Sequence, residues 1–84
     1  MLAQTQAPRI AASVVSDPSV MGGAPVVRGT RIPAETIVAY LRAGHTAQEI
    51  FEDYPSLPLD GIQAVIGWAE HTLGPHWREP LRTA

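Results

Sequence analysis

The sequence contains neither cysteine nor lysine, and it has no long apolar run. Without cysteine, disulfide bonds and thiolate metal sites are excluded. No stretch approaches the roughly 18 apolar residues that a membrane span needs. Residues 1–15 also lack the continuous apolar segment of a secretory signal. These absences predict a soluble, cytoplasmic protein with no membrane association.

Positive charge is scarce as well. Six Arg stand against eight Asp and Glu, so the formal net charge is −2. That is the wrong sign for a domain that binds nucleic acid through bulk electrostatics. Any contact with DNA must therefore come from a local cluster of Arg, whose guanidinium group suits both phosphate and carboxylate.

A chain of 84 residues makes one small domain, and a small core without disulfides often gains stability by oligomerising. We expect a flexible N-terminal tail over 1–12, a folded domain over 13–74 and a C-terminal tail over 75–84. Trp68 adds to the expectation of a homodimer. It lies away from the apolar face of its predicted helix and needs another surface to cover it.

The first part of the domain is predicted to be β structure. Two short runs rich in β-branched residues, 13–16 and 24–32, lie on either side of a turn-rich segment. These runs either pair as an irregular hairpin or each pair with a second copy of the chain.

After Pro33 the apolar spacing changes to a helical period. Gly44 is placed to be a left-handed cap, and Pro55 stops a helix that begins with a capping box of Thr46 and Glu49. The predicted helices are 33–43, 47–54 and 59–73. With the β segment they predict a mainly α domain, a trihelical helix-turn-helix fold with a short N-terminal β element.

The third predicted helix is poorly equipped to read DNA bases. It offers Gln63 and His71 beside Asp60 and Glu70, whereas base edges are read mostly by Arg, Lys, Asn and Gln. The helix-turn-helix spacing alone is therefore a weak indication of DNA binding.

The segment 22–35 contains Arg28 and Arg31 on either side of Gly29 and Thr30. In a structural interpretation Gly29 makes a tight turn, Thr30 bonds the local backbone, and the two Arg pair with acids of the chain. The acids considered are Glu35, Glu49 and Glu52. In a functional interpretation the two Arg, together with Arg42, contact phosphates or a partner's carboxylates. Both interpretations stay open.

Enzymatic chemistry finds no support in the pattern. His45, His71 and His76 lie far apart, and a zinc site would need further ligands that have no recognisable spacing. There is no nucleophile motif and no phosphate-binding glycine loop. We expect no catalytic residue, metal or cofactor, and solvated or capping positions for the histidines.

A series of short motifs then gives the sequence a family resemblance. The motifs are D17-P18, G22-G23-A24-P25-V26-V27-R28-G29-T30-R31-I32-P33, L41-R42-A43-G44, Y54-P55-S56-L57, I62-Q63-A64 and W68-A69. Their order resembles the prokaryotic domain-of-unknown-function family 433 over about 16–69. This resemblance implies a short helix-turn-helix protein of the VapB-like antitoxin kind, paired with a toxin similar to a PIN-domain nuclease.

The sequence departs from that family pattern at two places. Ala24 stands where the family usually has Lys, which removes a cation beside the two Arg. The family's Leu-Thr and two acids at the start of the third helix are replaced by L57-P58-L59-D60-G61, so a hydroxyl cap is lost. Gly61 and Gly67 are each expected to cost about 0.5 to 1 kcal/mol relative to Ala inside a helix.

The C-terminal tail carries apolar and basic side chains but is too short for a core of its own. Either Trp77 folds back over the third helix, or the tail docks on a partner with Trp and Arg as anchors. By analogy with VapB-type antitoxins, Arg78 or Arg82 would then take the place of a metal ion in a carboxylate-lined nuclease site. The candidate partner-binding residues are Trp68, Trp77, Arg78, Leu81 and Arg82.

The prediction is therefore a non-enzymatic antitoxin of a type II toxin-antitoxin system. It would bind and neutralise a PIN-like nuclease, with operator DNA as a further partner. The candidate DNA-binding residues are Arg28, Thr30, Arg31 and Arg42. The alternative is a small homodimeric protein-interaction module that does not bind DNA, and an absence of DNA binding even at low salt would favour it.

Overall fold

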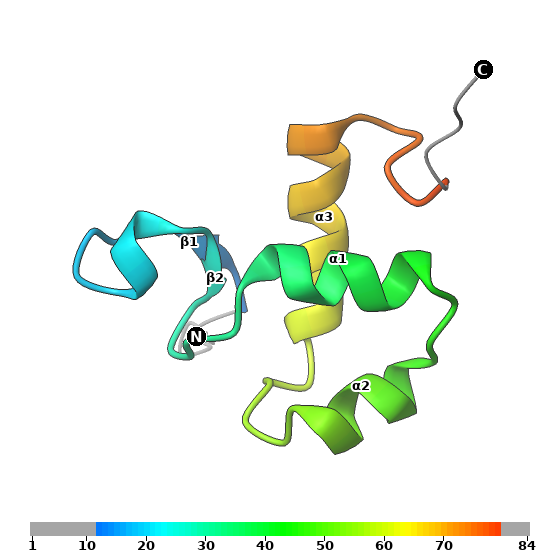
Figure 1. Ribbon diagram of the computed structural model, residues 1–84, viewed down its shortest axis with the longest axis horizontal. Helices are drawn as coiled ribbons and strands as arrows, with labels where there is room; N and C mark the ends of the chain where they lie inside the picture. The colour runs from blue at the N-terminus through cyan, green and yellow to red at the C-terminus, as the bar shows by residue number, and fades with distance from the viewer. Residues whose placement is uncertain (1–11, 80–84) are drawn as a thin grey trace, which may run out of the picture.

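A computed structural model describes residues 12–79, and Figure 1 shows how the elements of this part are arranged. The elements are β1 (Val14–Val15), the short 3₁₀ helix η1 (Met21–Gly23), β2 (Val26–Val27), α1 (Ala34–Arg42), α2 (Ala47–Asp53) and α3 (Gly61–Leu73). The chain is thus mainly helical with a small β ribbon before the helices. No helix in this part is long and apolar enough to cross a membrane.

The two strands form one antiparallel ribbon. Val14 lies opposite Val27, and Val15 lies opposite Val26. Of the two arrangements that the sequence left open, the structure thus contains the irregular hairpin within one chain. Its long connection is tightened at Asp17, whose carboxylate accepts hydrogen bonds from the backbone and the hydroxyl of Ser19.

The end signals of α1 and α2 are confirmed. Gly44 has φ +88°, and the chain closes α1 with two hydrogen bonds, from Gly44 N–H to the Leu41 carbonyl and from His45 N–H to the Tyr40 carbonyl. This is the Schellman pattern of helix ends. The capping box that opens α2 is also present, with Thr46 and Glu49 each accepting from the other's backbone N–H.

The start of α3 differs from the prediction. The helix begins at Gly61 and not near Leu59, because the residues before it form a turn in which Gly61 N–H donates to the Pro58 carbonyl (2.8 Å). Leu59 is consequently 92% exposed. The Asp60 carboxylate does not cap α3 but accepts a hydrogen bond from Ala12 N–H at 3.1 Å.

Gly61 is also not a helix-interior glycine as expected. A Cβ atom at this position would lie 2.8 Å from Cδ1 of Leu57, which is buried in the core. The absence of a side chain at Gly61 therefore allows Leu57 to pack. Gly67 lies inside the helix with open space around it, as an interior glycine with no packing function.

The core lies between α1, α3 and the ribbon. Figure 1 shows α1 crossing α3, with the ribbon at the N-terminal end of α1 and α2 near its C-terminal end. The buried apolar residues are Val26, Val27, Ile32, Ala34, Ile37, Val38, Ile50, Leu57, Ile62, Val65, Ala69 and Trp77. Leu73, the last residue of α3, is 45% exposed.

Candidate partner-binding surface

The chain turns sharply between β2 and α1. Thr30 N–H donates to the Val27 carbonyl at 3.0 Å, and Gly29 has φ +80°, a conformation that favours glycine. The Thr30 hydroxyl donates to the same Val27 carbonyl (2.7 Å) and accepts from Ile32 N–H (3.0 Å). Gly29 and Thr30 thus have the local roles that the structural interpretation gave them.

β2 is held on both sides, which fixes the start of this turn. Arg28 N–H donates to the Ser13 carbonyl next to β1 at 2.7 Å, whereas Val27 N–H donates to the Ile32 carbonyl at 2.9 Å. Beyond the turn, Ala34 N–H donates to the Pro25 carbonyl at 2.9 Å. We call residues 28–31 the arginine turn.

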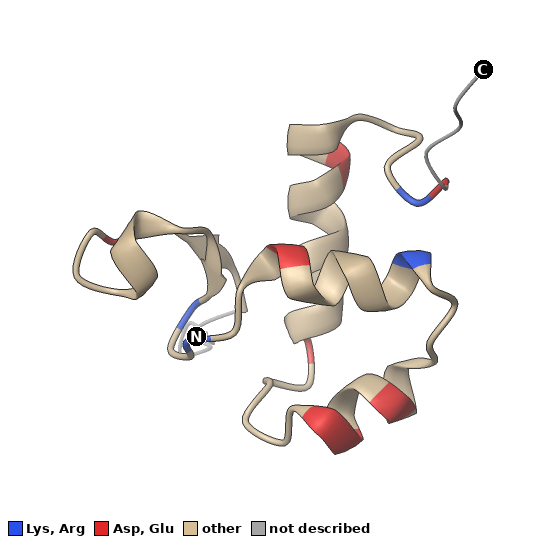
Figure 2. Ribbon diagram, in the orientation of Figure 1, with Lys and Arg blue, Asp and Glu red and all other residues tan. Residues whose placement is uncertain are grey.

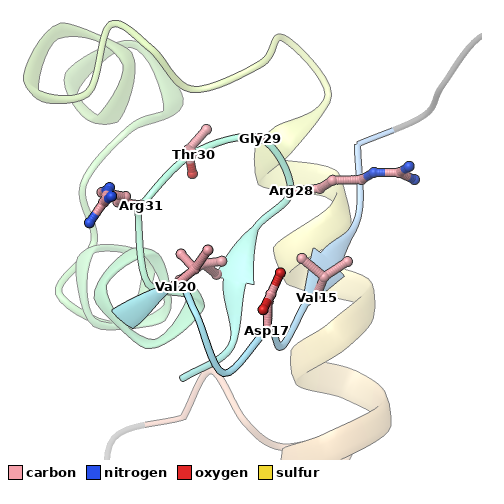
Figure 3. A pocket seen from close by; sticks show the side chains of 8 residues that line it. Val15, Asp17, Val20, Arg28, Gly29, Thr30 and Arg31 are labelled. Carbon is pink, nitrogen blue, oxygen red and sulfur yellow. The ribbon is translucent and has the colours of Figure 1, made fainter. Parts of the chain in front are cut away.

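Within residues 12–79 the two guanidinium groups of the arginine turn have no carboxylate partner. All eight Asp and Glu of the sequence lie within the described residues, yet the ion pairs found there join His45 to Glu49 and His76 to Glu79. Arg28 and Arg31 are both exposed. Figure 3 shows their side chains pointing to opposite sides of the turn, so they do not form one clamp.

The structural interpretation also paired these Arg with acids of the chain, and the structure contains no such pair among the described residues. Glu49 is occupied by the Thr46 backbone and by His45, and Glu52 lies 3.4 Å from the side-chain nitrogen of Gln48. Both carboxylates thus have partners three or four residues away in the sequence. Arg28 and Arg31 stay available for a partner outside the chain.

An open hollow of about 640 Å³ lies beside the arginine turn (Figure 3). Its apolar lining consists of Val15, Val20 and Val26, and its polar lining consists of Asp17, Arg28, Thr30 and Arg31. Hydrogen bonds from Ser19, first from its backbone and then from its hydroxyl, lower the pKa of Asp17. With Asp17 ionised, the rim still carries one net positive charge from side chains.

Arg42 does not join the other two Arg. It ends α1, whereas Arg31 precedes that helix, so about 13 Å of helix axis separates the two ends. The Arg42 Nε donates to the Trp77 carbonyl at 2.6 Å. The structure therefore gives Arg42 a role in holding the segment after α3, which the sequence did not predict.

Trp77 belongs to the core. Its side chain is 5% exposed, which matches the alternative in which Trp77 folds back onto the helices. Arg78 is exposed, and its guanidinium carbon lies 5.0 Å from the centre of the Trp77 ring. Trp68 is half-buried and packs against the same core within one chain. Leu81 and Arg82 lie outside the described residues.

Neither α2 nor α3, the two helices predicted to form the helix-turn-helix, contains an Arg or a Lys. Figure 2 shows acidic residues but no basic ones on α2 and α3. Gln63 and His71 are exposed on α3, next to the equally exposed Glu70. Within residues 12–79 no group of three or more His, Asp or Glu is placed to hold a metal ion.

The structure also contains a cluster that the sequence did not indicate. Tyr40 of α1 lies beside His45 and beside Tyr54, with ring centres 5.0 and 5.6 Å apart. The Tyr40 hydroxyl donates to Asp53 Oδ2 at 2.8 Å. This bond, followed by the neighbouring Tyr54 hydroxyl, raises the pKa of Tyr40 to about 12. The turn that closes α1 brings His45 to Tyr40, and the placement of α2 beside α1 brings Asp53 and Tyr54 to Tyr40.

Fold and surface together define a class: a small three-helix domain on a β ribbon, which offers an arginine turn and contains no buried charged residue in the part described. The chain belongs to the family described as "Protein of unknown function (DUF433)", which it matches over residues 14–69. The resemblance stated from the motifs is thereby confirmed, although the family description gives no activity.

Two relatives were found. "Uncharacterized protein y4eO" of Sinorhizobium fredii (strain NBRC 101917 / NGR234) is 42% identical over 57 residues, which cover 68% of this chain and 26% of that protein. The crystal structure of a DUF433 member protein from Anabaena variabilis ATCC 29413 is similar, with a TM-score of 0.65 and 33% identity over 71% of this chain and 59% of that chain. The chain thus spans about a quarter of the curated relative.

Proposed function

We propose that the protein is a non-enzymatic antitoxin of a type II toxin-antitoxin system, which binds and neutralises a PIN-like nuclease. In the absence of the toxin it forms a homodimer. The observation that carries this proposal is the state of Arg28 and Arg31. Both are exposed, and neither pairs with any of the eight Asp and Glu side chains. The family resemblance supplies the class of partner.

The chemistry of such a partner suits the arginine turn. The active site of a metal-dependent nuclease is lined with carboxylates, and a guanidinium group binds a carboxylate through two parallel hydrogen bonds. The backbone bonds around Val27, Thr30 and Ile32 hold the turn in place before binding, so little backbone entropy is lost.

Operator DNA is a weaker candidate partner. Neither α2 nor α3 has an Arg or Lys, and their exposed acids would repel phosphates. Contact with DNA would then rest on phosphate contacts from the arginine turn, which position a protein but do not read sequence. Replacing Arg28 by Ala would in that case weaken binding to all duplexes alike and make the salt slope shallower by about one unit.

The test begins with a search of the neighbouring genes for a PIN-like nuclease, and then measures its neutralisation in a growth-rescue assay with co-purification. The double variant R28Q/R31Q should lose both, with an unchanged circular dichroism spectrum. The matched control Q63E/T72E makes the same change of net charge at exposed positions of α3 and should retain both. A folded R28Q/R31Q protein that still binds and neutralises the toxin would overturn the proposal.

A further inference from the structure

The cluster at the junction of α1 and α2 presents rings and carboxylates together. Tyr40 and Tyr54 meet edge to face, and the His45 ring centre lies 5.0 Å from that of Tyr40. Asp53 accepts from the Tyr40 hydroxyl through one oxygen only. Tyr40 and Tyr54 are half-buried, whereas His45 and Asp53 are exposed. We call these four residues the tyrosine surface.

The carboxylates of this surface have no Arg partner among the described residues, although Glu49 pairs with His45. Among the described residues no Arg pairs with Asp53 or with its neighbours Glu49 and Glu52, which follow the same side of α2 at a spacing of three to four residues. Aromatic rings beside free carboxylate oxygens form the environment that a guanidinium group prefers, because it stacks on rings while its N–H groups bond the carboxylate.

The same chain supplies that group elsewhere. Arg28 and Arg31 are exposed and unpaired, and they leave the β ribbon at the opposite end of α1 from the tyrosine surface. One chain thus carries two complementary surfaces that do not meet within it. A second copy of the chain is the partner that satisfies both.

We infer that the arginine turn of one copy docks on the tyrosine surface of a second copy, and the reverse, in a closed dimer with two-fold symmetry. This inference rests on the homodimer of the proposed function. A two-fold axis makes each contact occur twice, so no complementary surface is left open to further copies.

Apolar surface at the same place favours close association. The hollow beside the arginine turn is lined by Val15 and Val20, and the nearby η1 helix presents Met21, which is 48% exposed. Exposed ion pairs alone hold little, whereas apolar burial and aromatic rings supply affinity at an interface. The charges would then set which surfaces meet.

The experiment is a measurement of mass by light scattering on the full chain at micromolar concentration. The wild type should give twice the chain mass of 9.0 kDa. The variants R28E/R31E and E52R/D53R should each give the monomer, because each places like charges against one another at both contacts. Glu70→Arg, a reversal at an exposed position of α3 outside both surfaces, should leave the dimer intact.

An equal mixture of the two reversed variants gives the decisive result. In the mixed pair the reversed turn of one copy faces the reversed tyrosine surface of the other, and the second contact is wild type, so the dimer mass should return. Circular dichroism is read first. A variant that has lost helix is replaced by R28Q/R31Q or E52Q/D53N, which should also weaken the dimer.

The outcomes separate this inference from the proposed function. A wild-type monomer overturns both the inference and the homodimer, while toxin binding is judged by its own assay. A wild-type dimer that persists in both reversed variants overturns the inference alone. Folded monomeric variants whose mixture stays monomeric also overturn it, because complementary charges would then have failed to restore the contact.

Discussion

Gly61 and Gly67 belong to the same helix but have different surroundings. A methyl group at the exposed Gly67 would meet nothing within 4 Å, whereas a methyl group at Gly61 would meet Leu57. Gly67→Ala should therefore stabilise the protein by about 0.5 to 1 kcal/mol, because alanine lowers the entropy of the unfolded chain. Gly61→Ala should destabilise it. Urea unfolding of both variants measures the difference, and equal effects would contradict the packing role of Gly61.

Tyr40 gives a second prediction for a single residue. Its hydroxyl proton is held by Asp53, and the pKa of Tyr40 rises from 10.0 to about 12. The raised value means that this bond contributes its full stabilisation below pH 10, and the contribution is lost as the pH rises through about 12. Ultraviolet titration of the Tyr54→Phe variant isolates Tyr40. Adding Asp53→Ala should lower its midpoint, since Asp53 is the first cause of the shift.

At the scale of elements, α2 depends on its first residue. The helix has seven residues and buries Ile50 alone, so the capping box contributes a large part of what holds its start. Thr46→Ala should cost about 1 kcal/mol in the free energy of unfolding. Thr46→Ser keeps the hydroxyl and should cost less. Thermal unfolding compares the two, and an equal loss would show that the hydroxyl bond is unimportant.

Helix ends that depend on capping residues close together in the sequence were predictable. Gly44 marks the end of α1, and the Thr46 and Glu49 pair marks the start of α2, because these bonds join residues at most five apart. The start of α3 was not predictable. The predicted helix included Leu59, whereas the turn from Pro58 to Gly61 precedes α3 and leaves Leu59 exposed.

The candidate surface divides in the same way. The turn at Gly29 and Thr30 was predictable, because every bond in it is local. The partners of Arg28 and Arg31 were not, since the carboxylate that a long side chain meets depends on the tertiary arrangement. The tyrosine surface escaped prediction for that reason too, as Tyr40 and Asp53 are 13 residues apart on different helices.

At the scale of the whole molecule, the core extends past the last helix. Trp77 is 5% exposed, and its carbonyl accepts from Arg42 at the end of α1. Trp77→Ala should cost about 3 to 5 kcal/mol, which is a large part of the stability of a small domain. Deleting residues 75–84 should lower the melting temperature at least as much. A truncated chain that melts like the full chain would contradict the placement of Trp77 in the core.

The two proposals together predict competition. In both proposals the guanidinium groups of Arg28 and Arg31 bind carboxylates, so a toxin and a second copy compete for the same two side chains. Adding toxin to the antitoxin should therefore convert the dimer into a complex with one antitoxin copy for each toxin. Native mass spectrometry follows both species in one titration. A complex that retains the antitoxin dimer, with both proposed contacts still sensitive to R28Q/R31Q, would refute this exclusivity.

The bond between Arg42 and Trp77 also bears on the order in which the protein is made and folded. It joins residues 35 apart and brings a segment that follows all three helices into the core. During synthesis the three helices leave the ribosome before Trp77 does. The core stays incomplete until that residue has emerged, so we expect the domain to fold as one unit at that point and not helix by helix during translation.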